Sequence, residues 1–153
     1  HNIQTIIICL FWKDVLLGRD KEYLEKGYKV VTAGYRLDPL FLRRLRTFIE
    51  LSDFTASNAT GTHVGYCVSL GKPHCIFKQK ILYNAYTNQD KISVPESYNE
   101  TVVDDRTEIA EAFSMFSNKI TEEQYAICNK YWGLEKFKSQ DELKAILESI
   151  EKK

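Results

Sequence analysis

Apolar residues in this chain gather in short runs that alternate with segments of helical spacing. The runs cover residues 5–12, 28–33, 54–57 and 74–77. The first run is β-branched and aromatic without alternation, which is typical of a central parallel strand covered on both faces. Helical spacing follows in the later half of 13–26, in 38–50 and in 64–70. This β-α-β-α-β-α-β order predicts a parallel sheet with right-handed crossovers.

The segment after Asp38 has the clearest amphipathic pattern, and Pro39 stands where a first helical residue is expected. One face of this predicted helix is apolar and consists of Phe41, Leu42, Leu45, Phe48 and Ile49. The opposite face is charged, and we interpret it as solvated; it consists of Arg43, Arg44, Arg46 and Glu50.

Beyond residue 77 the pattern changes. Residues 78–105 show no periodicity and predict an irregular excursion over the surface. Helical spacing returns at 106–117, at 121–131, where Thr121 opens a capping box, and at 139–151. Asp104 and Asp105 precede the first of these helices and fit a cap there, so we propose no metal. We therefore predict a single Rossmann-like α/β domain over 1–153, with a parallel-sheet core at 5–77, the excursion at 78–105 and C-terminal helices at 106–151.

Composition narrows the class of ligand. Lysine plus arginine equal aspartate plus glutamate at 21 each, so no net field attracts nucleic acid, and any anion site must be local. The four cysteines show no metal-ligand spacing, which favours reduced structural thiols and a cytoplasmic address. The longest apolar run falls well short of the ~20 residues that cross a bilayer. No cofactor is expected.

Candidate ligand-binding residues follow the predicted strands. In an open parallel sheet, ligands bind beyond the carboxyl ends of the strands, and a helix N-terminus there favours phosphate. The strand ends carry residues 12–14, 34–36 and 57–63, and the last of these leads into a helix. The candidate phosphate-binding residues are Lys13, Arg36, Ser57, Asn58, Thr60, Gly61, Thr62 and His63.

Each candidate has an ordinary structural alternative. The cluster at 57–63 also fits simple helix capping. His63 could be a catalytic base, a phosphate contact, or a first-turn residue bonded to a carbonyl, and the sequence identifies no catalytic residue. His74 opens an apolar strand, and we interpret it as a core histidine. The chain has no GxGxxG, Walker A, GxSxG or HExxH motif.

Four stretches together resemble a known family: residues 30–36, 41–45, 57–66 and 70–73. The most specific part is the Ser-Asn-x-x-Gly-Thr-His block at 57–63 followed by Leu-Gly-Lys-Pro at 70–73. This pattern resembles the C-terminal half of bacterial capsule and lipopolysaccharide glycosyltransferases of GT-B architecture. The resemblance implies binding of a nucleoside-diphosphate sugar as substrate, with residues 57–63 near its diphosphate and with Arg36 and Lys13 as anion partners.

The length of the chain accommodates one half of such an enzyme. The resemblance therefore implies that the glycan acceptor and much of the catalytic apparatus belong to a missing N-terminal half or to a partner chain. The resemblance is compatible with peripheral association of the full enzyme with the inner face of the membrane. It is also compatible with a homo-oligomer. Two alternatives stay open: a non-catalytic Rossmann-like interaction or regulatory module, and an enzyme related to sugar-nucleotide epimerases or pyruvyl transferases.

Overall fold

The computed structural model describes residues 3–77 and 107–151. It divides into two compact units, His1–Ser52 and Asp53–Lys153. Each unit combines helices with one parallel pair of strands, so the predicted mixed α/β class and parallel pairing are confirmed. In the described residues the strands form two separate two-stranded sheets, β1-β2 and β3-β4. The predicted excursion at 78–105, including Asp104 and Asp105, lies outside the described residues.

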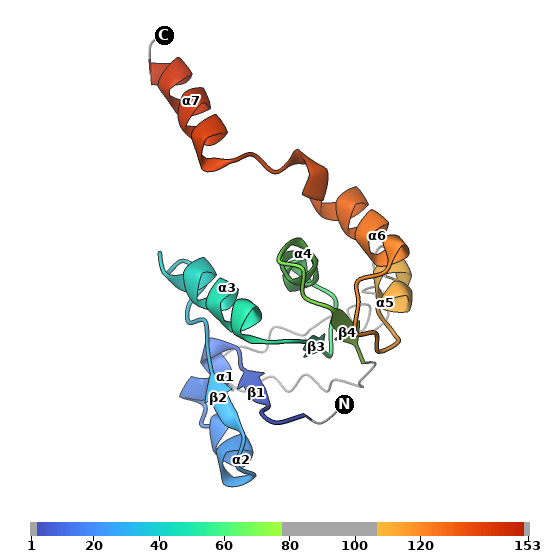
Figure 1. Ribbon diagram of the computed structural model, residues 1–153. Helices are drawn as coiled ribbons and strands as arrows, with labels where there is room; N and C mark the ends of the chain where they lie inside the picture. The colour runs from blue at the N-terminus through green and yellow to red at the C-terminus, as the bar shows by residue number, and fades with distance from the viewer. Residues whose placement is uncertain (1–2, 78–106, 152–153) are drawn as a thin grey trace, which may run out of the picture. The chain divides into compact units, whose positions relative to one another are not determined.

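The first unit is built on strands β1 (Ile7–Cys9) and β2 (Lys29–Val31), with Ile8 opposite Val30 (Figure 1). Helices α1 (Trp12–Leu16) and α2 (Asp20–Glu25) connect the strands, and α3 (Phe41–Leu51) follows β2. The turn after α2 takes Gly27 with a φ of 82°, which suits glycine because it has no Cβ. The predicted strand–helix–strand order is confirmed in this unit.

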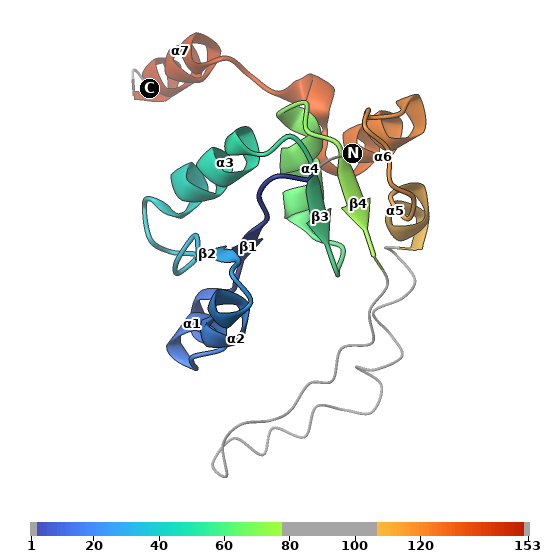
Figure 2. The ribbon, with the colours of Figure 1, turned by 60° about the horizontal axis from the view of Figure 1, so that its bottom comes forward.

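The second unit begins with strand β3 (Thr55–Ser57), helix α4 (Thr62–Ser69) and strand β4 (His74–Ile76). Figure 2 shows β3 and β4 side by side, as their parallel register requires. After the undescribed segment come α5 (Thr107–Ala112), α6 (Glu122–Trp132), a short 3₁₀ helix (Leu134–Lys136) and α7 (Gln140–Glu151). The predicted capping box is present, since Thr121 and Gln124 exchange both hydrogen bonds.

The main apolar core lies in the second unit, where α4 and β4 pack with α5, α6 and the 3₁₀ helix. Gly65 makes the approach of α4 to α6 close, because a Cβ at this position would lie 2.7 Å from the Trp132 ring. The buried cluster consists of Val64, Val68, Ile76, Ile109, Phe113, Ile127, Cys128 and Leu134.

Three predictions for the first unit are wrong. The first strand was expected to be covered on both faces, yet the face that carries Ile7 and Cys9 is open, with Ile7 40% exposed. Helix α3 begins at Phe41 and not at Pro39, because residues 39–40 form a turn ahead of the helix; in that turn the Asp38 carboxylate accepts the Leu40 N–H, as it would at a helix N-cap. Leu42, assigned to the apolar face, is 57% exposed.

None of the helices in residues 3–77 and 107–151 has the length and apolar character that crossing a bilayer requires. Helix α7, for example, is amphipathic, and charged residues interrupt its apolar ones. Its predicted apolar face exists as a stripe, and all four members of that stripe are exposed: Leu143, Ile146, Leu147 and Ile150.

Candidate functional site

An open hollow lies in the first unit, at the carboxyl ends of β1 and β2. It is lined by residues that follow the two strands: Phe11, Trp12, Lys13, Tyr35 and Arg36. Parallel strands place the residues that follow them at one edge of their sheet, which explains why segments more than twenty positions apart in the sequence meet here. The structure thus brings together Lys13 and Arg36, two of the residues predicted to bind an anion.

Aromatic rings and cations share this hollow. Trp12 and Tyr35 meet edge to face, with their ring centroids 5.4 Å apart, and Tyr35 is 47% exposed. The Lys13 ammonium lies 5.6 Å from the centroid of the Trp12 ring, within the range of a cation–π contact. A half-buried tryptophan and an exposed tyrosine next to a lysine and an arginine can bind a ligand that is part flat ring and part anion.

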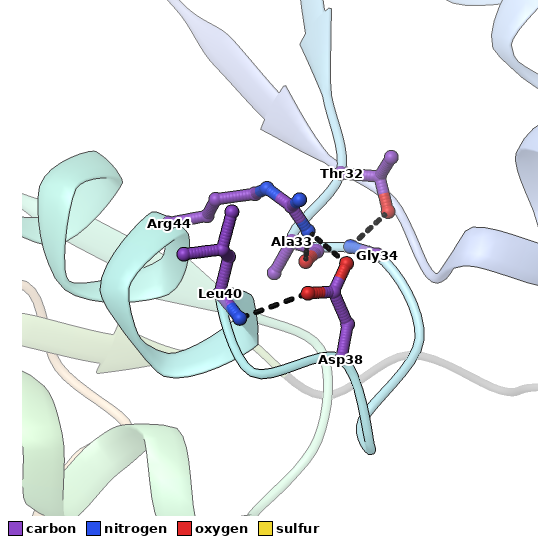
Figure 3. Close-up of polar contacts among 6 residues, drawn as sticks. All are labelled: Thr32, Ala33, Gly34, Asp38, Leu40 and Arg44. Atoms are coloured by element: carbon purple, nitrogen blue, oxygen red, sulfur yellow. Dashed lines mark hydrogen bonds and ion pairs between the residues drawn. The ribbon is translucent and has the colours of Figure 1, made fainter.

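A network of hydrogen bonds holds the loop that carries Tyr35 and Arg36 (Figure 3). Before them, the Gly34 N–H donates to the Thr32 hydroxyl at 3.1 Å. After them, the Asp38 N–H donates to the Tyr35 carbonyl at 2.9 Å. These bonds fix the backbone on both sides of the two residues that face the hollow.

Arg44 joins the two ends of this loop. Its Nη1 donates to the Ala33 carbonyl at 3.1 Å and to Asp38 Oδ2 at 2.8 Å, while Asp38 Oδ1 accepts the Leu40 N–H at 2.8 Å. The Leu40 N–H and then the Arg44 guanidinium lower the pKa of Asp38. Gly34 has a φ of 87°, and a Cβ there would lie 2.9 Å from Arg44 Nη1. Arg44, predicted to belong to a solvated face, instead contacts the loop.

In the second unit the predicted cluster at 57–63 includes one of two neighbouring histidines, His63, and contacts the other, His74, through Ser57. His74 is 2% exposed, and its ring nitrogens lie 2.8 Å from the Thr55 hydroxyl and 3.0 Å from the Ser57 hydroxyl. The interpretation of His74 as a core histidine is therefore confirmed. Burial, followed by the charge of nearby His63, lowers the pKa of His74 to about 4, so the ring is neutral near pH 7.

His63 lies edge to face with His74, with the ring centroids 5.6 Å apart. Burial lowers its pKa, and a hydrogen bond with the Ala59 backbone opposes that shift. A bond to a neighbouring carbonyl is one of the three roles that the sequence left open for His63. Its Nε2 is buried and has no hydrogen-bond partner in the structure, so this atom could still accept a proton or a hydrogen bond.

Helix α4 begins inside the predicted cluster, at Thr62. Its N-cap is Gly61, which is extended and provides no side-chain bond, and since glycine is among the residues favoured at this position, capping accounts for it. A Cβ at Gly61 would lie 2.9 Å from His63 Nδ1. Thr62 is exposed in the first turn, and Ser57 donates its hydroxyl to the Ala59 carbonyl at 2.8 Å. Among the eight candidates, residues 57–63 thus form a second group, in a different unit from Lys13 and Arg36.

The aromatic side chains of the hollow and Arg44 were not among the residues predicted to form a ligand-binding site. Trp12 and Tyr35 flank the predicted cations in the sequence, and their position after a strand could have marked them. Arg44 offered no such signal, because its contacts depend on how the loop folds back. Within the described residues, no group of three or more histidine, cysteine, aspartate or glutamate side chains could hold a metal ion.

Comparison with known proteins leaves the chain without an assigned family, since no family of proteins, no curated protein and no solved structure matches it.

Proposed function

We propose that this chain binds a nucleoside-diphosphate sugar as the donor-binding part of a glycosyltransferase that builds a bacterial surface glycan. The observation that supports it best is the hollow of the first unit, where Lys13 and Arg36 lie with Trp12 and Tyr35. The exposed Tyr35 ring suits a nucleobase, and the two cations suit a diphosphate. The resemblance of residues 57–66 and 70–73 to donor-binding halves adds the sugar-transfer chemistry.

The diphosphate is the leaving group of such a transfer, and negative charge grows on it as the bond to the sugar breaks. Fixed cations and backbone N–H groups stabilise that charge without reorganising. Lys13 and Arg36 fill this role in the proposal, and the first turn of α4 near Thr62 is a second candidate for it. The base that activates the acceptor comes, in this proposal, from the acceptor-binding half or partner chain.

The proposal includes one Rossmann-like sheet for the four strands. Its support is that both observed pairings are parallel and that a helix follows each of the first three strands. Such a sheet is the usual scaffold for ligands bound beyond the ends of parallel strands.

Calorimetric titration of the chain with uridine, cytidine, guanosine, adenosine and thymidine diphosphates tests the proposal. We expect saturable binding of one of them, weakened about tenfold or more by Arg36→Ala, since a hydrogen bond to a charged group contributes about 1.5–3 kcal/mol. Arg46→Ala is the matched control, because Arg46 is exposed and pairs with Glu50 on the surface of α3. Thr62→Ala tests the α4 candidate separately. No binding across the panel would contradict the proposal.

A second candidate function, an interaction module without chemistry, is favoured by the apolar side chains that the first unit exposes. A domain that docks onto another protein is expected to present such a surface. The large exposed apolar residues of β1, α1 and the segments around α3 include Ile7, Phe11, Leu16, Leu37, Leu40, Leu42 and Leu51. The titration separates the two functions, because a module of this kind binds no nucleotide.

A further inference from the structure

We infer that Arg44 and Asp38 are positioning residues that hold Tyr35 and Arg36 in the geometry that binds the donor. The inference rests on the proposed function of the hollow. Neither Arg44 nor Asp38 lines the hollow. Both act through the loop that connects β2 to α3, and that loop carries two of the five lining residues.

The bonds made by Arg44 lie on both sides of Tyr35 and Arg36 in the sequence. Arg44 Nη1 reaches the Ala33 carbonyl at 3.1 Å, before Tyr35, and the Asp38 carboxylate at 2.8 Å, after Arg36. One side chain therefore ties together the two ends of the loop. Ala33 is buried, so the inner end is fixed, and the outer end is held to it through Arg44 (Figure 3).

Asp38 accepts a hydrogen bond with each of its two carboxylate oxygens. Oδ2 accepts from Arg44 and Oδ1 accepts the Leu40 N–H at 2.8 Å. The Leu40 carbonyl in turn accepts the Arg44 N–H at 2.9 Å, which closes the network on α3. The loop is thus anchored to the first turn of a helix, which is more rigid than the loop itself.

A binding loop that loses its support lowers the affinity of the site even when the side chains that contact the ligand are unchanged. A ligand that must order a loop on binding spends part of its binding free energy on that ordering. If Arg44 no longer tied the loop, Tyr35 and Arg36 would keep their chemistry but sample other positions. Affinity would fall although every side chain of the hollow remained.

Charge supplies the sharpest test. If Arg44 acted only as a nearby positive charge, Asp38→Asn would strengthen binding of a diphosphate, because it removes a negative charge from the neighbourhood. If Arg44 and Asp38 position the loop, Asp38→Asn weakens binding, because the single amide oxygen of asparagine cannot replace both carboxylate oxygens that accept from Leu40 and Arg44. The two accounts predict opposite signs for the same substitution.

The experiment measures two quantities on the full chain and its variants: the dissociation constant for the nucleoside diphosphate found by titration, and amide hydrogen exchange. We expect Arg44→Met and Asp38→Asn each to weaken binding about tenfold and to accelerate exchange at Asp38 and Leu40. The Leu10 amide, which donates to the Val31 carbonyl between the strands, should keep its protection and report an intact fold. Arg44→Lys should restore part of both properties, and Arg46→Met should behave as the wild type.

The inference would be overturned by variants whose exchange at Asp38 and Leu40 equals that of the wild type, or by a loosened loop with an unchanged dissociation constant. Tighter binding by Asp38→Asn would overturn it as well, in favour of a purely electrostatic role. A wild type that binds no nucleoside diphosphate would instead contradict the proposed function. In that case the exchange data alone decide whether Arg44 orders the loop.

Discussion

The two units differ in how they bury their apolar side chains. In the second unit, helices and a strand enclose a cluster that includes fully buried Phe113 and Val64. Among the described residues of the first unit, the buried apolar side chains are Ala33 and Ile49. Packing of buried apolar side chains therefore contributes more to the second unit than to the first. The open surface that carries Lys13 and Arg36 therefore lies on the unit with fewer buried apolar side chains, where a bound ligand can contribute further contacts.

The largest effect is expected from Phe113→Ala, which removes a fully buried ring. Substitutions of this kind cost about 3–5 kcal/mol, because they lose apolar transfer and leave a cavity. Urea unfolding followed by the fluorescence of Trp132, in a Trp12→Phe background, measures the loss in the second unit. Phe116→Ala is the control, since Phe116 is exposed. Equal losses from the two substitutions would show that the cluster around Phe113 is not the core.

Acid is expected to destabilise the second unit next most strongly, through His74. Its pKa is about 4 in the folded state and 6.5 in the reference state, so below pH 6.5 the unfolded chain binds a proton that the folded chain does not. Stability is fully present above pH 6.5 and falls as the pH drops to about 4. The loss reaches about 3 kcal/mol, because each pH unit of this window contributes about 1.4 kcal/mol.

Unfolding free energies measured from pH 8 to pH 4 test this expectation, with His74→Gln as the comparison. The substitution should remove most of the dependence on pH in the second unit, apart from the part that His63 contributes through its own lowered pKa. A folded-state pKa of His74 near 6.5 would contradict it. That result would mean that bonds to the Thr55 and Ser57 hydroxyls offset the cost of burying the charged ring.

A smaller effect is expected from Thr121→Ala at the start of α6. The Thr121 hydroxyl accepts the Gln124 N–H at 3.1 Å, and loss of such a cap costs about 1 kcal/mol. Ser139→Ala makes a matched control, because Ser139 caps α7, whose side chains are exposed. Urea unfolding of the second unit should therefore respond to the first substitution and hardly to the second. The reverse order would show that α7 supports the core.

The smallest effect is expected on the open face of the first unit. Leu42→Ala should change the free energy of unfolding by less than about 0.5 kcal/mol, because the side chain is mostly exposed. Ile49→Ala, on the same helix but buried, should cost clearly more. Trp12 fluorescence during urea unfolding of the two variants provides the comparison. A large loss from Leu42→Ala would show that this face is packed in solution.

The sequence predicted the local elements well where the pattern and the caps agreed. The capping box at Thr121, the helix after Gly61 and the parallel strands all have short-range signals that do not depend on distant contacts. The start of α3 was misplaced because Pro39 fits a first helical turn and a loop equally well. The bond between Asp38 and Leu40 does not separate the two, because an aspartate ahead of a first helical turn makes the same bond.

The candidate site was predictable in part, for a physical reason. Lys13 and Arg36 follow parallel strands, and parallel pairing alone brings such positions to one edge. Burial of the first strand was not predictable, because an apolar run looks the same whether or not a neighbour covers it. The roles of Tyr35 and Arg44 depend on the fold of one loop, which leaves no periodic signal in the sequence.

The most direct test of the account uses the placement of one tryptophan in each unit. In protein labelled with 5-fluorotryptophan, Trp12 lies in the hollow and Trp132 packs beside Gly65, so the two fluorine resonances report the two units separately. The account predicts that a nucleoside diphosphate shifts the Trp12 resonance in a saturable manner, that the Trp132 resonance stays in place, and that Arg36→Ala weakens the response. A Trp12 resonance that stays in place at millimolar concentrations of every nucleotide would contradict it.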